Sequence, residues 1–252
     1  MRRARMLSLL LWTSVGCGGN ERVGHLPDAP PAGEPGIDLV TGGMIAFGDA
    51  DCGTTPAPRT LTFKNTGTAP LSWSATIDGD GFAITGGASG EVAPGESAAI
   101  SVAPEAIPST AAVGQPIVAM LVVESNASDD TIAVQLAVTP HGGSLHVATA
   151  AIGFGQAQLT ETLSEELEIT NTGDRAIQLA LGAPSNPDFT DAWAAAPAPA
   201  EVAPAASLAG AIAHFRPTTA AIENAVIAIA ATGPVCAGDA PEIAVTGEGT
   251  TA

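Results

Sequence analysis

Residues 61–67 read LTFKNTG, and residues 167–173 repeat that pattern as LEITNTG. Three further matches occur in the same order: IAFGDA (45–50) with IGFGQA (152–157), Gly81-Phe82 with Asp188-Phe189, and EVAP at both 91–94 and 201–204. The matched segments are 106 to 110 residues apart, and chance does not produce four ordered matches at one spacing. The chain therefore contains two copies of one module.

Between these landmarks, apolar and polar residues alternate with period two, as in 60–64, 117–123, 131–138 and 166–170. Short strands separated by Asn-Thr-Gly, Asp-Gly-Asp-Gly and Ala-Pro-Gly-Glu turns are typical of antiparallel β-sandwiches. The Ala-rich stretch 192–213 is broken repeatedly by proline, so helix is not expected there. The sequence predicts an all-β fold with two tandem immunoglobulin-like sandwiches, at 37–141 and 142–252.

The repeated motifs resemble the immunoglobulin-like modules of choice-of-anchor D proteins, which are related to the abnormal-spindle and hydin type of domain. The shared pattern is a Phe-Gly strand, a strand that ends in Asn-Thr-Gly, a GF-like segment, an apolar-Ala-Pro-Gly turn and a Phe-x-Pro-Thr strand end (215–218). The second copy has Ala205 where the turn glycine is expected, and the first has Val102-Ala-Pro for the Phe-x-Pro. The resemblance covers about 37–250 and implies a binding or architectural role without catalytic residues.

Several aromatic and turn residues have a direct physical interpretation. Phe47 and Phe154 are expected to anchor edge strands that close each sandwich, and Asn-Thr-Gly is expected to supply a positive φ through Gly or Asn. Trp73 is expected in the core of the first sandwich. Trp193 lies in a proline-rich segment and is expected either to fill the core or to form an exposed contact.

The N-terminus reads MRRARMLSLLLWTSVGC, a basic segment followed by a short apolar run and small residues before a cysteine. This pattern predicts an export signal over 1–16. Ser14-Val-Gly-Cys17 resembles the bacterial lipobox, which implies that Cys17 is lipidated and becomes the mature N-terminus. The alternative is an ordinary signal peptide with an incidental cysteine. Residues 17–36 are rich in Gly, Pro and charge, which favours a flexible tether, and no later apolar stretch is long enough to span a membrane.

Charge narrows the range of partners. The chain has 26 acidic and 8 basic residues, and three of the latter, Arg2, Arg3 and Arg5, fall within the expected signal. Because nucleic-acid binding depends on Lys and Arg, so acidic a protein is not expected to bind nucleic acid. The expected partners are a membrane, through the lipid on Cys17, and an unidentified envelope protein or polymer. Gly18 after the cysteine favours the outer membrane.

Cys52 and Cys236 are the remaining cysteines, an even pair in a compartment where disulfides persist. Cys52 follows the first motif strand of the first copy, and Cys236 precedes the last strand of the second. In tandem immunoglobulin-type sandwiches those two positions face each other across the junction. We therefore predict a Cys52–Cys236 disulfide, which would close a loop of about 184 residues and contribute at most ~5 kcal/mol by loop entropy. Free thiols or a bond to a partner are the alternative.

No pattern of catalytic residues is evident. His25 lies in the tether, His141 and His146 flank the junction as expected solvated linker residues, and His214 lies in a strand. No cofactor or metal is expected. Asp78-Gly-Asp80-Gly, residues 129–130, Asp188 and Asp191 could offer oxygen ligands to calcium, but the full ligand pattern is missing. The sequence therefore favours a non-enzymatic binding or scaffolding protein, with a purely structural spacer as the alternative.

Overall fold

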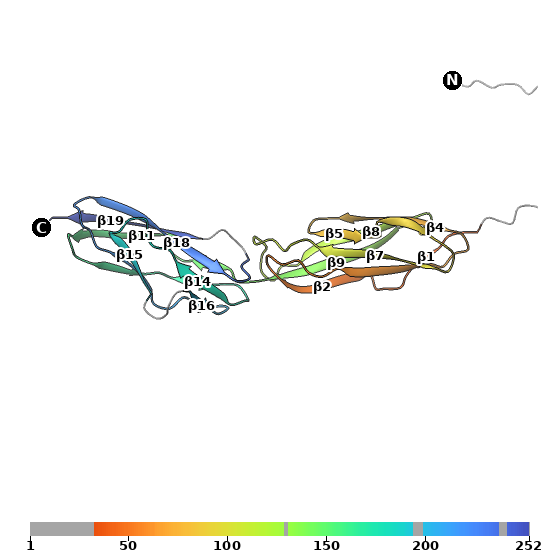
Figure 1. Ribbon diagram of the computed structural model, residues 1–252, viewed down its shortest axis with the longest axis horizontal. Coiled ribbons are helices and arrows are strands. Elements are labelled where there is room, and N and C mark those ends of the chain that lie inside the picture. The colour runs from red at the N-terminus through yellow and green to blue at the C-terminus, as the bar shows by residue number, and fades with distance from the viewer. Residues whose placement is uncertain (1–32, 129–130, 194–198, 237–240, 252) are drawn as a thin grey trace, which may run out of the picture. The chain divides into compact units, whose positions relative to one another are not determined.

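The computed structural model describes residues 33–128, 131–193, 199–236 and 241–251, and for 191–193 only the backbone. All regular structure in these residues is β, as the sequence predicts, and it forms two immunoglobulin-like sandwiches (Figure 1). Among the described residues, none lies in a helix long and apolar enough to cross a membrane. The export signal, Cys17 and His25 lie outside the described residues.

The first sandwich has two sheets, in the strand orders β1-β3-β7-β5 and β2-β9-β8-β4-β6. Its strands are β1 (Ile37–Leu39), β2 (Met44–Asp51), β3 (Arg59–Asn65), β4 (Leu71–Asp78), β5 (Phe82–Gly86), β6 (Ser89–Val92), β7 (Ser97–Pro104), β8 (Ile117–Ser125) and β9 (Thr131–His141). The edge strand β2 pairs in parallel with β9, and the other pairs are antiparallel.

The second sandwich repeats this topology, with sheets in the orders β11-β19-β18-β14-β16 and β12-β17-β15 and a short β10-β13 pair. Its strands are β10 (Leu145–Val147), β11 (Ala151–Gln158), β12 (Leu163–Glu166), β13 (Ile169–Asn171), β14 (Ile177–Leu181), β15 (Phe189–Trp193), β16 (Ala200–Val202), β17 (Ala211–Phe215), β18 (Ile222–Thr232) and β19 (Glu242–Thr250). The strand expected over 166–170 is interrupted, because the buried Leu167 and its neighbour Glu168 separate β12 from β13.

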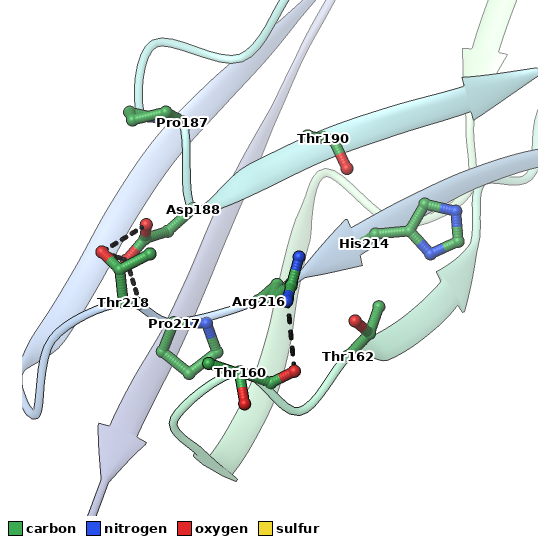
Figure 2. Close-up of a pocket in the computed structure, with 9 residues that line it drawn as sticks. All are labelled: Thr160, Thr162, Pro187, Asp188, Thr190, His214, Arg216, Pro217 and Thr218. Carbon is green, nitrogen blue, oxygen red and sulfur yellow. Dashed lines mark hydrogen bonds between the residues drawn. The ribbon is translucent and has the colours of Figure 1, made fainter.

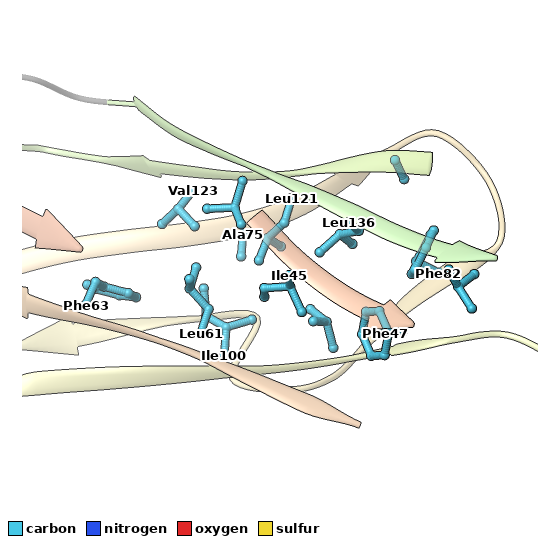
Figure 3. Packing of buried hydrophobic residues seen from close by; sticks show 14 of the residues in the cluster. Ile45, Phe47, Leu61, Phe63, Ala75, Phe82, Ile100, Leu121, Val123 and Leu136 are labelled. Atoms are coloured by element: carbon cyan, nitrogen blue, oxygen red, sulfur yellow. The ribbon is translucent and has the colours of Figure 1, made fainter. Parts of the chain in front are cut away.

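Alternation along the strands builds each core. Figure 3 shows apolar side chains from both sheets of the first sandwich filling the space between them, including Leu61, Phe63, Ile100, Leu121 and Leu136. Trp73 belongs to this cluster, as predicted, and its ring meets Phe63 edge-on at a centroid distance of 5.0 Å. The second core contains a cluster of three aromatic rings, those of Phe154, Phe189 and Phe215. Separate cores let each module bury its apolar surface.

The recurring Phe-Gly motif forms a bulge in an edge strand. Gly48 and Gly155 have left-handed φ values of 76° and 74°, and the parallel register of β2 and β11 shifts next to them. Glycine adopts this conformation without the steric cost of a side chain. Phe47 and Phe154 are buried beside these glycines in edge strands, as the sequence predicts.

The Asn-Thr-Gly motif has a different role from the one predicted. None of its residues has a positive φ in either copy. Instead, a Cβ on Gly67 would meet the carbonyl oxygen of Glu34, and a Cβ on Gly173 would meet that of Gly142. The glycine is needed because the preceding chain segment passes too close to admit a side chain.

The asparagine of the motif is a buried hydrogen-bonding centre. Asn65 is 0% exposed; its Nδ2 donates to the carbonyl oxygens of Ala69 at 2.8 Å and Val92 at 2.9 Å. Its Oδ1 accepts from the backbone N–H groups of Gly67 at 2.9 Å and Gly36 at 3.3 Å. One side chain thus ties three chain segments together and leaves its own polar atoms satisfied.

The second copy reproduces the same network around Asn171, which is also 0% exposed. Its Nδ2 donates to the carbonyl oxygens of Arg175 and Val202, and its Oδ1 accepts from the N–H groups of Gly173 and Ser144. The repeated tripeptide therefore fixes how each sandwich receives the chain that enters it.

Candidate functional site

The two cysteines form the predicted disulfide. Cys52 directly follows β2, Cys236 lies between β18 and β19, and their Cα atoms are 5.4 Å apart. Both residues are buried. The N–H of Cys52 donates to the carbonyl oxygen of His141, and that of Cys236 donates to the carbonyl oxygen of Gly143. The segment that connects the sandwiches is therefore held by both cysteines.

Charged side chains surround this segment, and they correct the expectation for His141. Its side chain is only 21% exposed, with Nε2 3.1 Å from Asp49 Oδ1 and Nδ1 2.5 Å from Asp174 Oδ2. Arg175 Nε donates to Asp51 Oδ1 at 3.1 Å. His141 was expected to be solvated because Asp49 and Asp174, the carboxylates that contact it, are distant from it in the sequence. His146 is exposed, as expected, but it lies in strand β10 of the second sandwich and not in a linker.

The acidic residues considered as calcium ligands do not come together in the described parts of the chain. Gly79 and Gly81 have positive φ values of 111° and 84°, so the Asp78 to Gly81 segment is a glycine-dependent turn. Within the described ranges, no group of three or more His, Cys, Asp or Glu side chains is placed to hold a metal ion. Residues 129–130 and the side chains of Asp191 and Trp193 lie outside the described parts.

A pocket of about 530 Å³ opens in the second sandwich. It lies between the turn that joins β11 to β12, the start of β15 and the end of β17, and Figure 2 shows the side chains that line it. Its walls carry four hydroxyl groups, one imidazole, one guanidinium and one carboxylate. The lining residues are Thr160, Thr162, Pro187, Asp188, Thr190, His214, Arg216, Pro217 and Thr218.

Hydrogen bonds hold the pocket walls in place. The carboxylate of Asp188, a residue that is 7% exposed, accepts from the N–H of Thr218 at 3.0 Å and from its hydroxyl at 3.0 Å. Arg216 Nε donates to the carbonyl oxygen of Thr160 at 3.2 Å. Ser164 Oγ lies 2.7 Å from His214 Nδ1. The acidic group is thus satisfied within the protein, while the guanidinium bonds to a neutral carbonyl.

An apolar patch lies on the outer face of the first sandwich. Met44 is 58% exposed and Val118 is 52% exposed. The register aligns Met44 with Gln135 and Met120, and Ala46 with Ala137 and Val118, across β2, β9 and β8. We call the following residues the outer apolar patch: Met44, Ala46, Val118, Met120 and Ala137.

Neither the pocket nor the outer apolar patch was predicted from the sequence. The sequence placed His214 in a strand, and it placed Asp188 in a repeated motif and among the possible calcium ligands, without bringing the two together. One feature of the sequence could have pointed to the pocket. Arg216 is one of four Lys or Arg residues after position 32, and it lies in the Phe-x-Pro-Thr motif. The patch had a weaker signal, since Val118 and Met120 occupy alternate positions of an apolar strand.

The comparisons with known proteins concern the fold. No family model matches the sequence, and no curated protein matches it. The two sandwiches are immunoglobulin-like. Similar solved structures include a protein of unknown function from Porphyromonas gingivalis W83 (15% identity, 84% of this chain and 99% of that one, TM-score 0.34). Others are the PapD-like domain 7 of human CEP192 (16%, 51% and 96%, 0.34) and the E. coli chaperone DraB (10%, 83% and 98%, 0.34). At such identities and scores they carry no argument about function.

Proposed function

We propose that this chain is a non-enzymatic binding and scaffolding protein of the cell envelope, anchored by acyl groups on Cys17. The observation that supports it most directly is the outer apolar patch on the first sandwich. The five patch residues come from three neighbouring strands: Ala46, Ala137 and Val118 lie side by side, and Met44 and Met120 flank the exposed Gln135. Contiguous apolar surface of this kind is typical of protein contact sites.

The chemistry of the patch favours a protein partner over a polysaccharide. Val118, Met120 and Met44 offer no hydrogen-bonding groups to sugar hydroxyls, whereas burying them against apolar side chains removes their surface from water. Methionine side chains are flexible and adapt to different partner surfaces. The partner that we propose is therefore another envelope protein with a complementary apolar surface.

The resemblance to choice-of-anchor D modules supports the same class of function, because such modules imply binding or architecture. The lipobox-like Ser14-Val-Gly-Cys17 supports anchorage, and Gly18 favours the outer membrane. A purely structural spacer is the second candidate. The Cys52–Cys236 disulfide and the ion pairs of His141 and Arg175 favour it, because they join the sandwiches without requiring a ligand.

Anchorage is tested by the intact mass of the membrane-extracted protein. We expect a diacyl or triacyl mass on a chain that begins at Cys17, and labelling of two cysteines only after reduction. A lipid-free mass would contradict the anchor, whatever the state of the disulfide.

Binding is tested by replacing Val118 with Glu in the full-length protein and recovering partners from detergent-solubilised envelopes. A charge in the middle of a buried apolar contact is expected to weaken the complex by about tenfold or more. Ile222→Glu is the matched control, since Ile222 is 69% exposed and lies in the second sandwich. Partners lost from Val118→Glu and kept by Ile222→Glu would support the binding role. Identical recovery by all three proteins would favour the spacer.

A further inference from the structure

The pocket of the second sandwich carries one of the few cationic side chains of a strongly acidic protein. Formal net charge is −18, and four of the eight basic residues fall in the described parts of the chain: Arg59, Lys64, Arg175 and Arg216. Arg175 pairs with Asp51, and Arg59 lies over the ring of Phe47 at 5.9 Å. Within the described ranges, Arg216 forms no ion pair with a carboxylate. A guanidinium at the wall of a cavity is thus available to an anion from outside.

The carboxylate that lines the pocket together with Arg216 is bonded to another residue. Asp188 is the one carboxylate of the pocket lining, and Thr218 binds both of its oxygens through a backbone N–H and a hydroxyl. The backbone N–H of Arg216 donates to the carbonyl oxygen of Asp188 at 2.7 Å, so the two residues are neighbours through their main chains. Their side chains nevertheless bond to different residues, that of Arg216 to Thr160 and that of Asp188 to Thr218.

Backbone strain marks the opposite wall. Thr160 has a φ of 72°, in the left-handed region that β-branched residues rarely adopt. Two contacts hold it there: its N–H donates to the carbonyl oxygen of Pro217 at 3.0 Å, and its own carbonyl accepts from Arg216 Nε. Strain maintained by specific contacts is a feature of binding sites that are formed before the ligand arrives.

The first sandwich has the same backbone arrangement without the pocket chemistry. There the N–H of Glu105 donates to the carbonyl oxygen of Gly81, as that of Arg216 does to Asp188. The pairing of Ala83 with Ala103 corresponds to that of Thr190 with His214. Glutamate therefore stands where the second sandwich has Arg216, and alanine where it has His214. The shared fold does not require this constellation.

We propose that the pocket binds a small ligand that carries one carboxylate and several hydroxyl groups, as a uronic acid does. A planar guanidinium matches the two oxygens of a carboxylate. The hydroxyls of Thr160, Thr162 and Thr190 line the pocket with Arg216 and offer donors and acceptors to sugar hydroxyls. The imidazole of His214 adds a further polar group beside its contact with Ser164. The net charge of the protein disfavours polyanions, so a single acidic sugar fits best.

The test titrates the full-length protein with D-glucuronate and follows binding by calorimetry, with D-glucose and acetate as comparison ligands. Glucuronate is expected to bind more tightly than either, because glucose lacks the carboxylate and acetate lacks the hydroxyls. Arg216→Gln is expected to weaken glucuronate binding by about tenfold or more, the size of one lost charge-assisted hydrogen-bonding group. Arg59→Gln is the matched control and is expected to bind like wild type.

A second variant separates binding from folding. Thr190→Val removes a hydroxyl from an exposed strand position, and valine suits a strand. It is expected to reduce glucuronate affinity severalfold while acetate binding stays unchanged. Equal affinities for glucuronate and glucose, equal binding by Arg216→Gln and wild type, or absence of binding at millimolar glucuronate would each overturn the proposal. If glucuronate binds, the affinity for a polysaccharide that ends in a uronic acid is then compared with the affinity for the free sugar. The tighter ligand indicates whether the natural source is a polymer or a free sugar.

Discussion

The two sandwiches share their interior and differ on their surfaces. Both have the buried asparagine with the same four hydrogen bonds, the Phe-Gly bulge in the edge strand that pairs in parallel, and the EVAP segment after the GF-like strand. The outer apolar patch belongs to the first sandwich, whereas the pocket with Arg216 belongs to the second. One framework thus presents two different surfaces, and we assign a protein contact to one and a small polar ligand to the other.

The largest effect is expected from separating the two sandwiches by replacing Cys52 and Cys236 with Ser. Because the disulfide closes a loop of 184 residues, its loss is expected to lower the free energy of unfolding by up to about 5 kcal/mol. Each sandwich retains its own apolar cluster, so both are expected to stay folded and to unfold in two resolved steps.

Calorimetric unfolding of the double variant checks this, with reduced wild-type protein as the comparison. Unchanged, single-step unfolding would mean that the ion pairs of His141 and Arg175 join the sandwiches without help from the disulfide. Retention of two folded cores with a lowered first transition would show that the disulfide couples them.

The next largest effect is expected at the buried asparagines. Asn65→Ala and Asn171→Ala each leave two carbonyl oxygens and two N–H groups without their partner, at an expected cost of about 3 kcal/mol. The two costs should be equal, since the networks match bond for bond. Denaturant unfolding measures both. Asn126→Ala is the control, because Asn126 is exposed and its loss is expected to cost less than about 1 kcal/mol.

The sequence was informative wherever a feature occurs twice or depends on period-two alternation. The repeat and the alternation predicted the all-β fold, and the positions of Cys52 and Cys236 relative to their strands predicted the disulfide. Asn-Thr-Gly was misinterpreted because a tripeptide that needs positive φ and one that needs close approach of another chain segment have the same composition. Only the structure shows Glu34 and Gly142 beside these glycines.

The pocket escaped prediction for a related reason. Matching Phe215-x-Pro to Val102-x-Pro by sequence displaces the comparison by two residues. In the register, Pro104 pairs with Phe82 as Phe215 pairs with Phe189. The correct alignment makes Glu105 of the first copy equivalent to Arg216 of the second. This reversal of charge between the copies becomes visible only once the strand pairing is known. Exposure of Val118 and Met44 likewise depends on whether another element covers the outer face, which alternation does not reveal.

The smallest effect is expected at the turn before β7 and β17, where the copies differ by one methyl group. Gly95 has a φ of 81°, and Ala205 adopts a φ of 57° at the corresponding position. In both copies the N–H of this residue donates to the backbone carbonyl oxygen of the buried asparagine at 2.9 Å, so the turn is held in place despite the strain on alanine.

Ala205→Gly is expected to stabilise the second sandwich by about 1 kcal/mol, and Gly95→Ala to destabilise the first by a similar amount. Thermal unfolding of the two variants measures both shifts. Opposite signs would show that alanine is strained at this turn position in both copies. Destabilisation by Ala205→Gly would instead mean that the added chain freedom of glycine outweighs the relief of strain, and that the second sandwich gains from its alanine.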